Sequence, residues 1–329
     1  MRKIIPAIAL ILGGMQPVAA TAAQNMDFSN EYNASSIHAE GDSYFIEQVN
    51  ELTNGEVNIT LHTGGALGFK SADHFYAVAD NAIQIADTLA GTMGGIDPIF
   101  LLSSLPFLAD NEDEAEQLYR IARPYYEKVF ADNDQVLLYA SPWPASGIWA
   151  KKEVASADQL AQLKIRTYDK NGTLTLKEAG ASPVKLSWAD VVPQLSTGGI
   201  EAVLTSAEAG ASASFWEHLN HYSAIQYAIP LNMVHMNKDA FDSLDESQQQ
   251  AILEAAKRTD EHNWQEVRSR VVSNYEELNA NGVAIKTELP TDFTELLTSA
   301  AKPALAEWLE STGEDGQEIL TQFEQASNP

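Results

Sequence analysis

Short apolar segments that alternate with helical segments are the feature of this sequence that most limits its fold. Early in the chain, strand-like patterns at Asp27–Asn33, Val57–Leu61 and Ile83–Leu89 are separated by helical patterns at His38–Leu52 and Ala72–Asn81. This alternation predicts parallel strands, because a parallel pair needs a long crossover connection that a helix can supply. We therefore expect an α/β sheet with flanking helices here.

The same alternation resumes after a long acidic helix predicted at Glu112–Phe130. The strands expected at Gln135–Ala140 and Ile148–Lys152 lie on either side of Ser141-Pro142-Trp143-Pro144, a proline-rich stretch that could bridge two lobes. Beyond that helix we expect strands at Gln135–Ala140, Ile148–Lys152, Lys164–Tyr168 and Ala202–Ser206, another strand before Ser187, and helices at Ala157–Leu163 and Asn171–Ala179. We predict lobe I at 24–145, with 234–275 contributing, and lobe II at 146–233, with 276–329 contributing.

Two serines are placed to cap helices. Ser71 precedes the helix at Ala72–Asn81, and its hydroxyl could accept from a first-turn amide. Ser187 precedes another helix and has Asp190 three residues later, which is a capping-box spacing. We expect both to begin helices.

A single long helix is predicted from Asp245 to about Ala280. Trp264, Val267, Val271 and neighbouring apolar residues recur at intervals of three and four, which gives one apolar stripe. A helix of ~35 residues would be roughly 50 Å long at 1.5 Å per residue. It would outrun one small lobe and could brace two.

Residues 1–23 have the pattern of a cleaved secretory signal peptide. Arg2 and Lys3 precede an apolar stretch from Ile4 to Met15, and Ala20-Thr21-Ala22 offers a cleavage site. The apolar stretch of about 12 residues is shorter than the ~20 that span a bilayer. We therefore expect export to the periplasm, and no direct membrane insertion.

The composition excludes several classes of protein. The formal net charge is −26, and loss of Arg2 and Lys3 with the signal peptide would make it −28. Such a chain would be repelled by nucleic acids and anionic membranes, so we expect no nucleic-acid partner. The chain has no cysteine, which removes disulfides, cysteine-ligated metals and thiol nucleophiles.

Catalytic and cofactor motifs are weak or missing. The sequence has no G-x-S-x-G, Walker A or H-E-x-x-H motif, and Gly64–Gly68 lacks the spacing of a dinucleotide loop. His218 and His221 could share a helix face and seed a metal site with Glu217 or Glu208, but no third ligand is spaced convincingly. We expect no metal, no cofactor and no enzyme. The alternative is a secreted α/β enzyme that acts on a small organic acid.

Arg166 is the most informative charged residue. It lies mid-strand between apolar neighbours in Leu163-Lys164-Ile165-Arg166-Thr167-Tyr168. It could be a surface salt-bridge residue, or a buried arginine whose planar fork holds a carboxylate. Composition alone leaves both open.

The sequence resembles the periplasmic substrate-binding proteins of TRAP transporters, the DctP-like family, over essentially the whole chain after residue 23. The resemblance rests on four stretches in the same order and spacing: Thr63–Gly68, Ser104–Leu108, Leu163–Arg166 and Leu195–Glu201. It implies a two-lobed periplasmic-binding-protein clamp with parallel or mixed sheets, flanking helices and a long interlobe helix. It also implies capture of a small organic anion for delivery to a sodium-driven TRAP permease, by a protein that acts as a monomer.

The resemblance also implies which residues bind the ligand. Arg166 matches the family arginine that grips the ligand carboxylate, Trp188 matches an aromatic residue that packs on the ligand, and Thr205 matches a polar residue at the end of the next strand. Further candidate ligand-binding residues are Ser36, Phe107, Ser146, Trp149 and Trp216.

Three departures from the family pattern affect the expected ligand. Gln162 replaces a usual glycine, and Glu201-Ala202 replaces an Asp-Gly pair. Ser146-Gly147 stands where some members have a second arginine, which argues against doubly clamped ligands such as sialic acid. Tryptophans could instead form an apolar wall, so we expect an aromatic or bulky aliphatic monocarboxylate. For Trp149 and Trp216, core packing is the competing expectation.

Overall fold

The computed structural model describes residues 24–327. The expected signal peptide, residues 1–23, lies outside the described residues. Within the described range, no helix combines the length and the apolar character needed to cross a membrane.

The first of two sheets has five strands in the order β2-β1-β3-β10-β4. Strand β1 is parallel to β2 and β3, as the strand–helix alternation predicts, whereas β10 is antiparallel to both β3 and β4. The chain therefore returns to this sheet late in the sequence. The strands are β1 Gln24–Asn30, β2 Val57–His62, β3 Ile85–Leu89, β4 Gln135–Pro142 and β10 Leu231–Asn237.

The second sheet has six strands in the order β11-β9-β5-β8-β6-β7. Strand β6 is parallel to β7 and β8, and β5 is antiparallel to β8 and β9. The strands are β5 Ser146–Ala150, β6 Lys164–Thr167, β7 Ser182–Lys185, β8 Ala202–Ser206, β9 His221–Ser223 and β11 Ala284–Lys286. The predicted α/β class with two mixed sheets is confirmed.

Helices flank both sheets. The α-helices are α1 Ile37–Thr53, α2 Ser71–Ala79, α3 Glu112–Ala131, α4 Ala157–Leu160, α5 Lys170–Glu178, α6 Val191–Thr197, α7 Ala207–Ser212, α8 Lys238–Asp242, α9 Glu246–Ala280, α10 Thr291–Thr312 and α11 Glu314–Ser327. The short 3₁₀ turns are η1 Ala90–Met93, η2 Pro98–Ser104, η3 Trp188–Asp190 and η4 Phe215–Glu217.

Both predicted serine caps are wrong in detail. Helix α2 already includes Ser71, and its N-cap is Lys70, because Asp73 accepts from the Lys70 backbone and sets the start one residue earlier. Ser187 precedes the 3₁₀ turn η3 and makes no side-chain cap bond. Helix α6 begins only at Val191.

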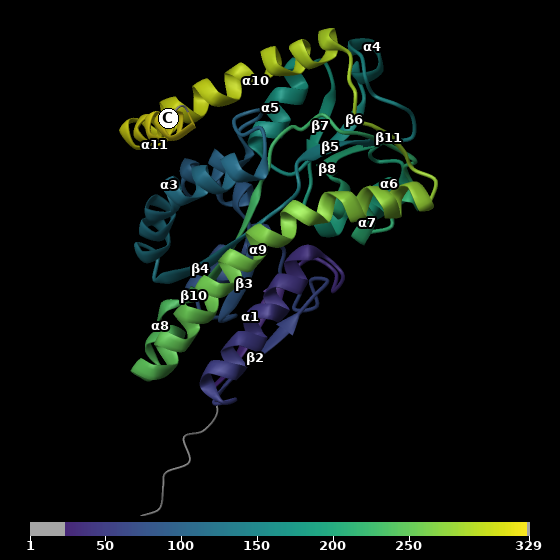
Figure 1. Cartoon of the computed structure of the whole chain (residues 1–329). Helices are drawn as coiled ribbons and strands as arrows, with labels where there is room; N and C mark the ends of the chain where they lie inside the picture. The colour runs from purple at the N-terminus through teal and green to yellow at the C-terminus, as the bar shows by residue number, and fades with distance from the viewer. Residues whose placement is uncertain (1–23, 328–329) are drawn as a thin grey trace, which may run out of the picture.

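Helix α9 connects the two lobes, as predicted. Asp245 caps it through a capping box with Gln248. Its first half packs against α1 and β4 of the first lobe, and its second half reaches α7 and β11 of the second (Figure 1). This single rigid element spans both sheets.

The C-terminal helices do not stay with one lobe. Helix α10 packs against α5 and η2, whereas α11 packs against α3 (Figure 1). Ile319 and Phe323 of α11 join the apolar cluster that includes Tyr119 and Phe130 of α3. Residues 314–327 therefore lie against the first lobe, although our sequence-based division assigned them to lobe II.

An apolar cluster lies where the lobes meet. It joins Tyr32, which follows β1, and Leu89, which ends β3, to Ile165 and Leu204 in strands of the second sheet. The junction between the lobes is thus packed, and it surrounds the site described next.

Candidate functional site

A cavity lies between the lobes, at one edge of both sheets. Its free volume is about 20 Å³, room for roughly one water molecule, so a larger ligand would fit only with the lobes further apart. The first lobe and the segments joining the lobes supply Tyr32, Leu89, Trp143 and Pro230, and the second lobe supplies Ser146, Arg166, Tyr168, Trp188, Thr205 and Ser206.

Strand direction explains why these residues meet. Leu89 ends β3, Ser206 ends β8, and Tyr168 directly follows β6. In open α/β sheets the carboxyl ends of parallel strands share one edge, and ligands bind in the crevice outside that edge. Ser146 reaches the same edge because β5 runs antiparallel to β8 and pairs Ser146 with Ser206.

Arg166 is buried in this cavity and oriented by the backbone. It is 3% exposed. Its Nε donates to the carbonyl oxygen of Leu186 at 3.0 Å, and Nη1 donates to that of Leu204 at 3.5 Å. Its guanidinium also lies over the Trp188 ring, 5.7 Å from the centroid. These contacts fix the planar fork while leaving donors on both terminal nitrogens.

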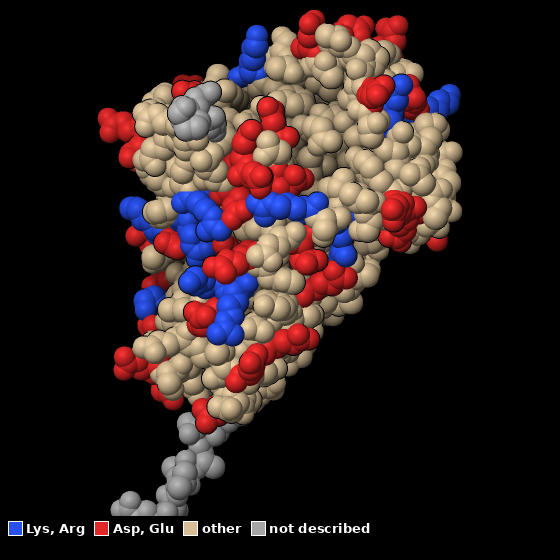
Figure 2. All heavy atoms as spheres, viewed as in Figure 1, with Lys and Arg blue, Asp and Glu red and all other residues tan. Residues whose placement is uncertain are grey.

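Arg166 differs from the other described arginines in its charge partners. Arg120, Arg123, Arg258, Arg268 and Arg270 each form an ion pair with a carboxylate. Figure 2 shows basic side chains interleaved with acidic ones across this face of the molecule. Among residues 24–327, Arg166 forms no ion pair within 4 Å. A buried guanidinium without a carboxylate partner is costly, so the site favours an anion.

The electrostatics around Arg166 are dominated by burial. Burial lowers the pKa of Arg166 from its usual value, while Tyr32 and Glu31 act in the opposite direction. Burial also raises the pKa of Glu31, and hydrogen bonds from Ser71 oppose that rise. Arginine nevertheless stays protonated in proteins. The cavity therefore presents a fixed positive charge in surroundings of low polarity.

Aromatic rings form one wall of the cavity. Tyr32 lies between Trp143 and Trp188, with ring centroids 5.0 Å and 5.9 Å away. Trp188 in turn stacks on Phe215 at 5.7 Å, with 25° between the planes. Because Tyr32 belongs to the first lobe and Trp188 to the second, this wall is complete only when the lobes are together.

The Thr63–Gly68 segment supports Tyr32 through backbone hydrogen bonds. Gly64 and Gly65 have φ of +65° and +66°, a conformation that glycine adopts without strain. Their amides donate to the carbonyl oxygens of Tyr32 at 2.6 Å and Asn30 at 3.1 Å. The glycines therefore position the aromatic wall.

A buried polar network lies behind the aromatic wall. Trp143 Nε1 donates to Asn232 Oδ1 at 2.8 Å, and Asn232 Nδ2 donates to Asp87 Oδ1 at 2.6 Å. Asn30 Nδ2 donates to both Asp42, at 2.6 Å, and Asp87, at 3.3 Å. Burial raises the pKa of Asp87 to about 7 and that of Asp42 well above its usual value. The two carboxyl groups thus lie together and favour holding a proton.

Comparison with known proteins places this geometry in a family. Residues 28–312 match the family described as bacterial extracellular solute-binding protein, family 7. The chain belongs to this family. It is 23% identical over 281 residues to the ectoine-binding periplasmic protein TeaA of Halomonas elongata, covering 82% of this chain and 81% of that protein.

Solved structures of family 7 proteins share the fold. DctP6 of Bordetella pertussis, an extracytoplasmic solute receptor binding pyroglutamic acid, has a TM-score of 0.88 and 30% identity, covering 92% of this chain and 100% of that one. A TRAP solute-binding protein specific for pyroglutamate, from a marine metagenome, has the same TM-score and identity, covering 93% and 100%. The two-lobed clamp and the TRAP solute-binding family are confirmed.

In this family 7 protein, four predicted site residues meet in the cavity. Arg166, Trp188, Thr205 and Ser146 all line it. Ser146 Oγ is 3.4 Å from the hydroxyl oxygen of Tyr168. The strand register places these residues at the same sheet edge, which the sequence alone could not specify.

The other four predicted site residues do not line the cavity. Trp149 is fully buried, donates from Nε1 to the Ser206 carbonyl oxygen at 3.0 Å, and packs with Phe215 and Tyr222. Trp216 packs partly buried against the same second-lobe cluster. Phe107 packs against Tyr227 in the interlobe cluster, and Ser36 caps α1 by accepting from the Ala39 amide. All four make structural contacts.

Sequence reasoning missed most of the first-lobe side of the cavity. Tyr168 could have been found, because it lies two residues after Arg166 and strand residues two apart share a face. Tyr32 and Trp143 come from the other lobe, and no sequence signal indicates that they meet Trp188. The remaining missed residues are Leu89, Ser206 and Pro230.

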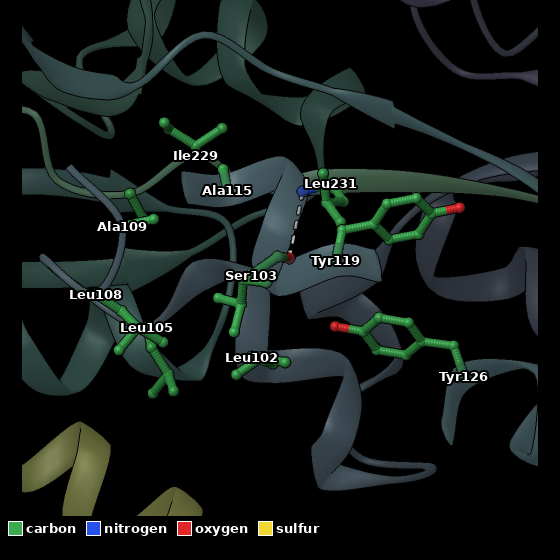
Figure 3. Close-up of a pocket in the computed structure, with 12 residues that line it drawn as sticks. Leu102, Ser103, Leu105, Leu108, Ala109, Ala115, Tyr119, Tyr126, Ile229 and Leu231 are labelled. Atoms are coloured by element: carbon green, nitrogen blue, oxygen red, sulfur yellow. Dashed lines mark hydrogen bonds between the residues drawn. The ribbon is translucent and has the colours of Figure 1, made fainter. Parts of the chain in front are cut away.

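A second cavity is bordered by residues of α3 and η2 (Figure 3). Its volume is about 20 Å³, enough for roughly one water molecule. Its lining is largely apolar, and the Ser103 hydroxyl that borders it is engaged with the Leu231 amide at 3.2 Å. Unlike the cavity that contains Arg166, it is lined by no charged side chain, so it does not suit an organic anion.

His218 and His221 do not have the arrangement on one helix face that a metal site would need. His218 follows η4 and His221 begins β9, so the two do not share a helix face. Glu208 is buried and accepts from Arg270 and Asn274. Among residues 24–327, no three histidine, aspartate or glutamate side chains come together to hold a metal ion.

Proposed function

We propose that this protein captures a small organic monocarboxylate in the periplasm, with the carboxylate bound by Arg166, and delivers it to a TRAP permease. The observation that carries this proposal is the buried, oriented guanidinium that lacks a carboxylate partner among the described residues. A ligand carboxylate would supply the missing charge through two parallel hydrogen bonds.

Pyroglutamate is the proposed ligand. The two pyroglutamate-binding proteins described above are each 30% identical to this chain over nearly its full length. A ligand with one carboxylate suits a site that contains one arginine, and a small ring would need only a modest separation of the lobes, because the free volume of the cavity is about 20 Å³. The hydroxyls of Ser146, Thr205 and Ser206 could bond the ring amide, while the wall formed by Trp188 and Tyr32 could cover one face of the ring.

Closure of the lobes would make the binding selective and slow to reverse. Arg166 and Trp188 come from the second lobe, and Tyr32 and Trp143 approach from the first lobe and its connection. A ligand could enter only when the lobes separate. Their closure would exclude water, which strengthens charge-assisted hydrogen bonds.

The cellular part of the proposal rests on the family and on the N-terminal sequence. Family 7 is described as extracellular and solute-binding, and the similar proteins named above are described as an ectoine-binding periplasmic protein and a TRAP solute-binding protein. The Arg2–Ala22 pattern would direct the chain to the periplasm before cleavage. We propose that the mature protein acts as a monomer there.

A thermal-shift experiment with matched compounds tests this function. Protein beginning at residue 24 is heated with L-pyroglutamate, with L-proline, and with 2-pyrrolidone, which keeps the ring but lacks the carboxylate. We expect pyroglutamate to raise the melting temperature and 2-pyrrolidone to have no effect, because only a bound ligand stabilises by mass action.

Calorimetry and chromatography complete that test. Titration should give one site per chain, and the recovered pyroglutamate should be chemically unchanged after hours with the protein. Equal stabilisation by 2-pyrrolidone would contradict the role of Arg166. Consumption of the ligand would instead support the secreted enzyme.

A further inference from the structure

An ion pair outside the cavity links the two lobes. Lys70 Nζ lies 3.0 Å from Oδ1 and 2.8 Å from Oδ2 of Asp190, so both carboxylate oxygens are engaged. Lys70 is the N-cap of α2 in the first lobe, and Asp190 ends η3 in the second. Neither residue lines the cavity. The pair therefore acts on lobe geometry rather than on the ligand.

The first-lobe end of this pair is held firmly. The backbone amide of Lys70 donates to Asp73 Oδ2 at 3.1 Å. The next residue, Ser71, donates to Glu31 from its hydroxyl at 2.9 Å and from its amide at 3.2 Å. Glu31 directly precedes Tyr32. The backbone of Lys70 is thus tied to the same segment that forms the aromatic wall.

The second-lobe end of the pair belongs to the turn that carries Trp188. Turn η3 contains only Trp188, Ala189 and Asp190, and the Asp190 amide donates to the Ser187 carbonyl oxygen at 3.1 Å. In so short a turn, fixing Asp190 also restricts Trp188. Trp188 lies against the Arg166 guanidinium, and its ring centroid is 5.9 Å from that of Tyr32 in the aromatic wall.

We propose that Lys70 and Asp190 are a positioning pair that holds the Trp188 turn against the first lobe in the closed clamp and slows ligand release. This inference rests on the proposed function of the Arg166 site. Lys70 and Asp190 side chains are 40% and 44% exposed. Dissolved salt therefore reaches the pair, and the release rate should depend on ionic strength.

A second contact between the lobes is buried and provides a contrast. Glu208 of α7 accepts from the Ile37 amide of α1 at 2.9 Å and from Arg270 Nε of α9 at 2.9 Å. Its side chain is only 2% exposed. This contact should be much less sensitive to salt. Arg270 also pairs with Glu40 of α1, whose side chain is 53% exposed, so salt dependence alone does not separate the two contacts and charge exchange is needed.

Charge exchange between Lys70 and Asp190 tests the proposal. We compare wild-type protein, Lys70→Asp, Asp190→Lys and the double exchange. Lys238→Asp is the matched control, because Lys238 and Asp242 form an exposed pair within α8. Release of pyroglutamate is followed by stopped-flow tryptophan fluorescence at low and high ionic strength, and the melting temperature is measured without ligand.

Each single exchange should speed release at low salt by about two- to five-fold. Exposed ion pairs contribute modestly, and each exchange also replaces an attraction with a repulsion. The double exchange should restore slow, salt-sensitive release, and the control should match wild-type protein. Unchanged release in both single variants, or no recovery in the double exchange, would overturn the positioning role alone. Failure of wild-type protein to bind any of the tested acids would overturn the proposed function and this inference together.

Discussion

Replacement of Arg166 by methionine should separate ligand binding from folding. Methionine keeps most of the length of the side chain and removes the guanidinium. In the structure this residue is buried, bonds two backbone carbonyls and lacks a carboxylate partner among residues 24–327. Its charge is therefore available for a ligand. In the unliganded protein, loss of the guanidinium has two opposing effects on the free energy of unfolding.

The size of the binding loss follows from the burial of the contact. Removal of one partner of a buried, hydrogen-bonded charge pair costs about 2–5 kcal/mol. This corresponds to a weakening of roughly 30- to 5,000-fold in Kd.

The expected effect on the unliganded protein is much smaller. Removal of the buried cation relieves its desolvation, which favours the variant. The carbonyls of Leu186 and Leu204 each lose a donor, which opposes that gain. We expect the free energy of unfolding to change by no more than about 1–2 kcal/mol in either direction.

Calorimetry with pyroglutamate and 2-pyrrolidone measures the first effect, and urea unfolding without ligand measures the second. Arg120→Met is the matched control, because Arg120 is exposed and paired with Glu116 on the surface of α3. Wild-type affinity for pyroglutamate in Arg166→Met would refute the reasoning. A large loss of stability without ligand would show that Arg166 is chiefly structural.

Three further predictions follow from the cavity and its surroundings. Trp188→Ala should weaken pyroglutamate binding at least about tenfold by calorimetry, with Trp188→Phe intermediate; equal affinities would exclude a role for the ring. Gly210→Ala should destabilise the fold by about 1–3 kcal/mol in urea, because a Cβ there would lie 2.1 Å from the buried Trp149 ring; an unchanged midpoint would contradict this. Burial raises the pKa of Asp87 to about 7, so the folded protein keeps a proton that the unfolded chain releases above about pH 4. The free energy of unfolding should therefore fall as the pH rises from about 4 to 7. Relative to wild-type protein, Asp87→Asn should therefore gain stability between pH 5 and 8, by an amount on the order of a few kcal/mol; parallel stability curves would refute the assignment.

The sequence predicted local elements well because their signals are local. The α9 stripe and the strand Ala202–Ser206 both depend on neighbouring residues. The late return of β10 to the first sheet was only partly anticipated. Its antiparallel pairing with β3 and β4 depends on contacts between distant parts of the chain.

The two halves of the site differed in how far they could be predicted. Arg166 and Trp188 were identified through family resemblance, and strand alternation indicates Tyr168. Tyr32 and Trp143 reach the cavity only because the lobes come together, which no local pattern encodes. Trp149 has the same side chain as Trp188, but alternation along β5 turns it into the second-lobe core.

A crystal structure of the protein with bound pyroglutamate tests the central claim most directly. The account predicts density between the lobes, with the ligand carboxylate about 2.7–2.9 Å from both terminal nitrogens of Arg166 and the ring beside Trp188. Ligand density elsewhere, or a carboxylate held by other residues while Arg166 contacts only backbone carbonyls, would contradict it.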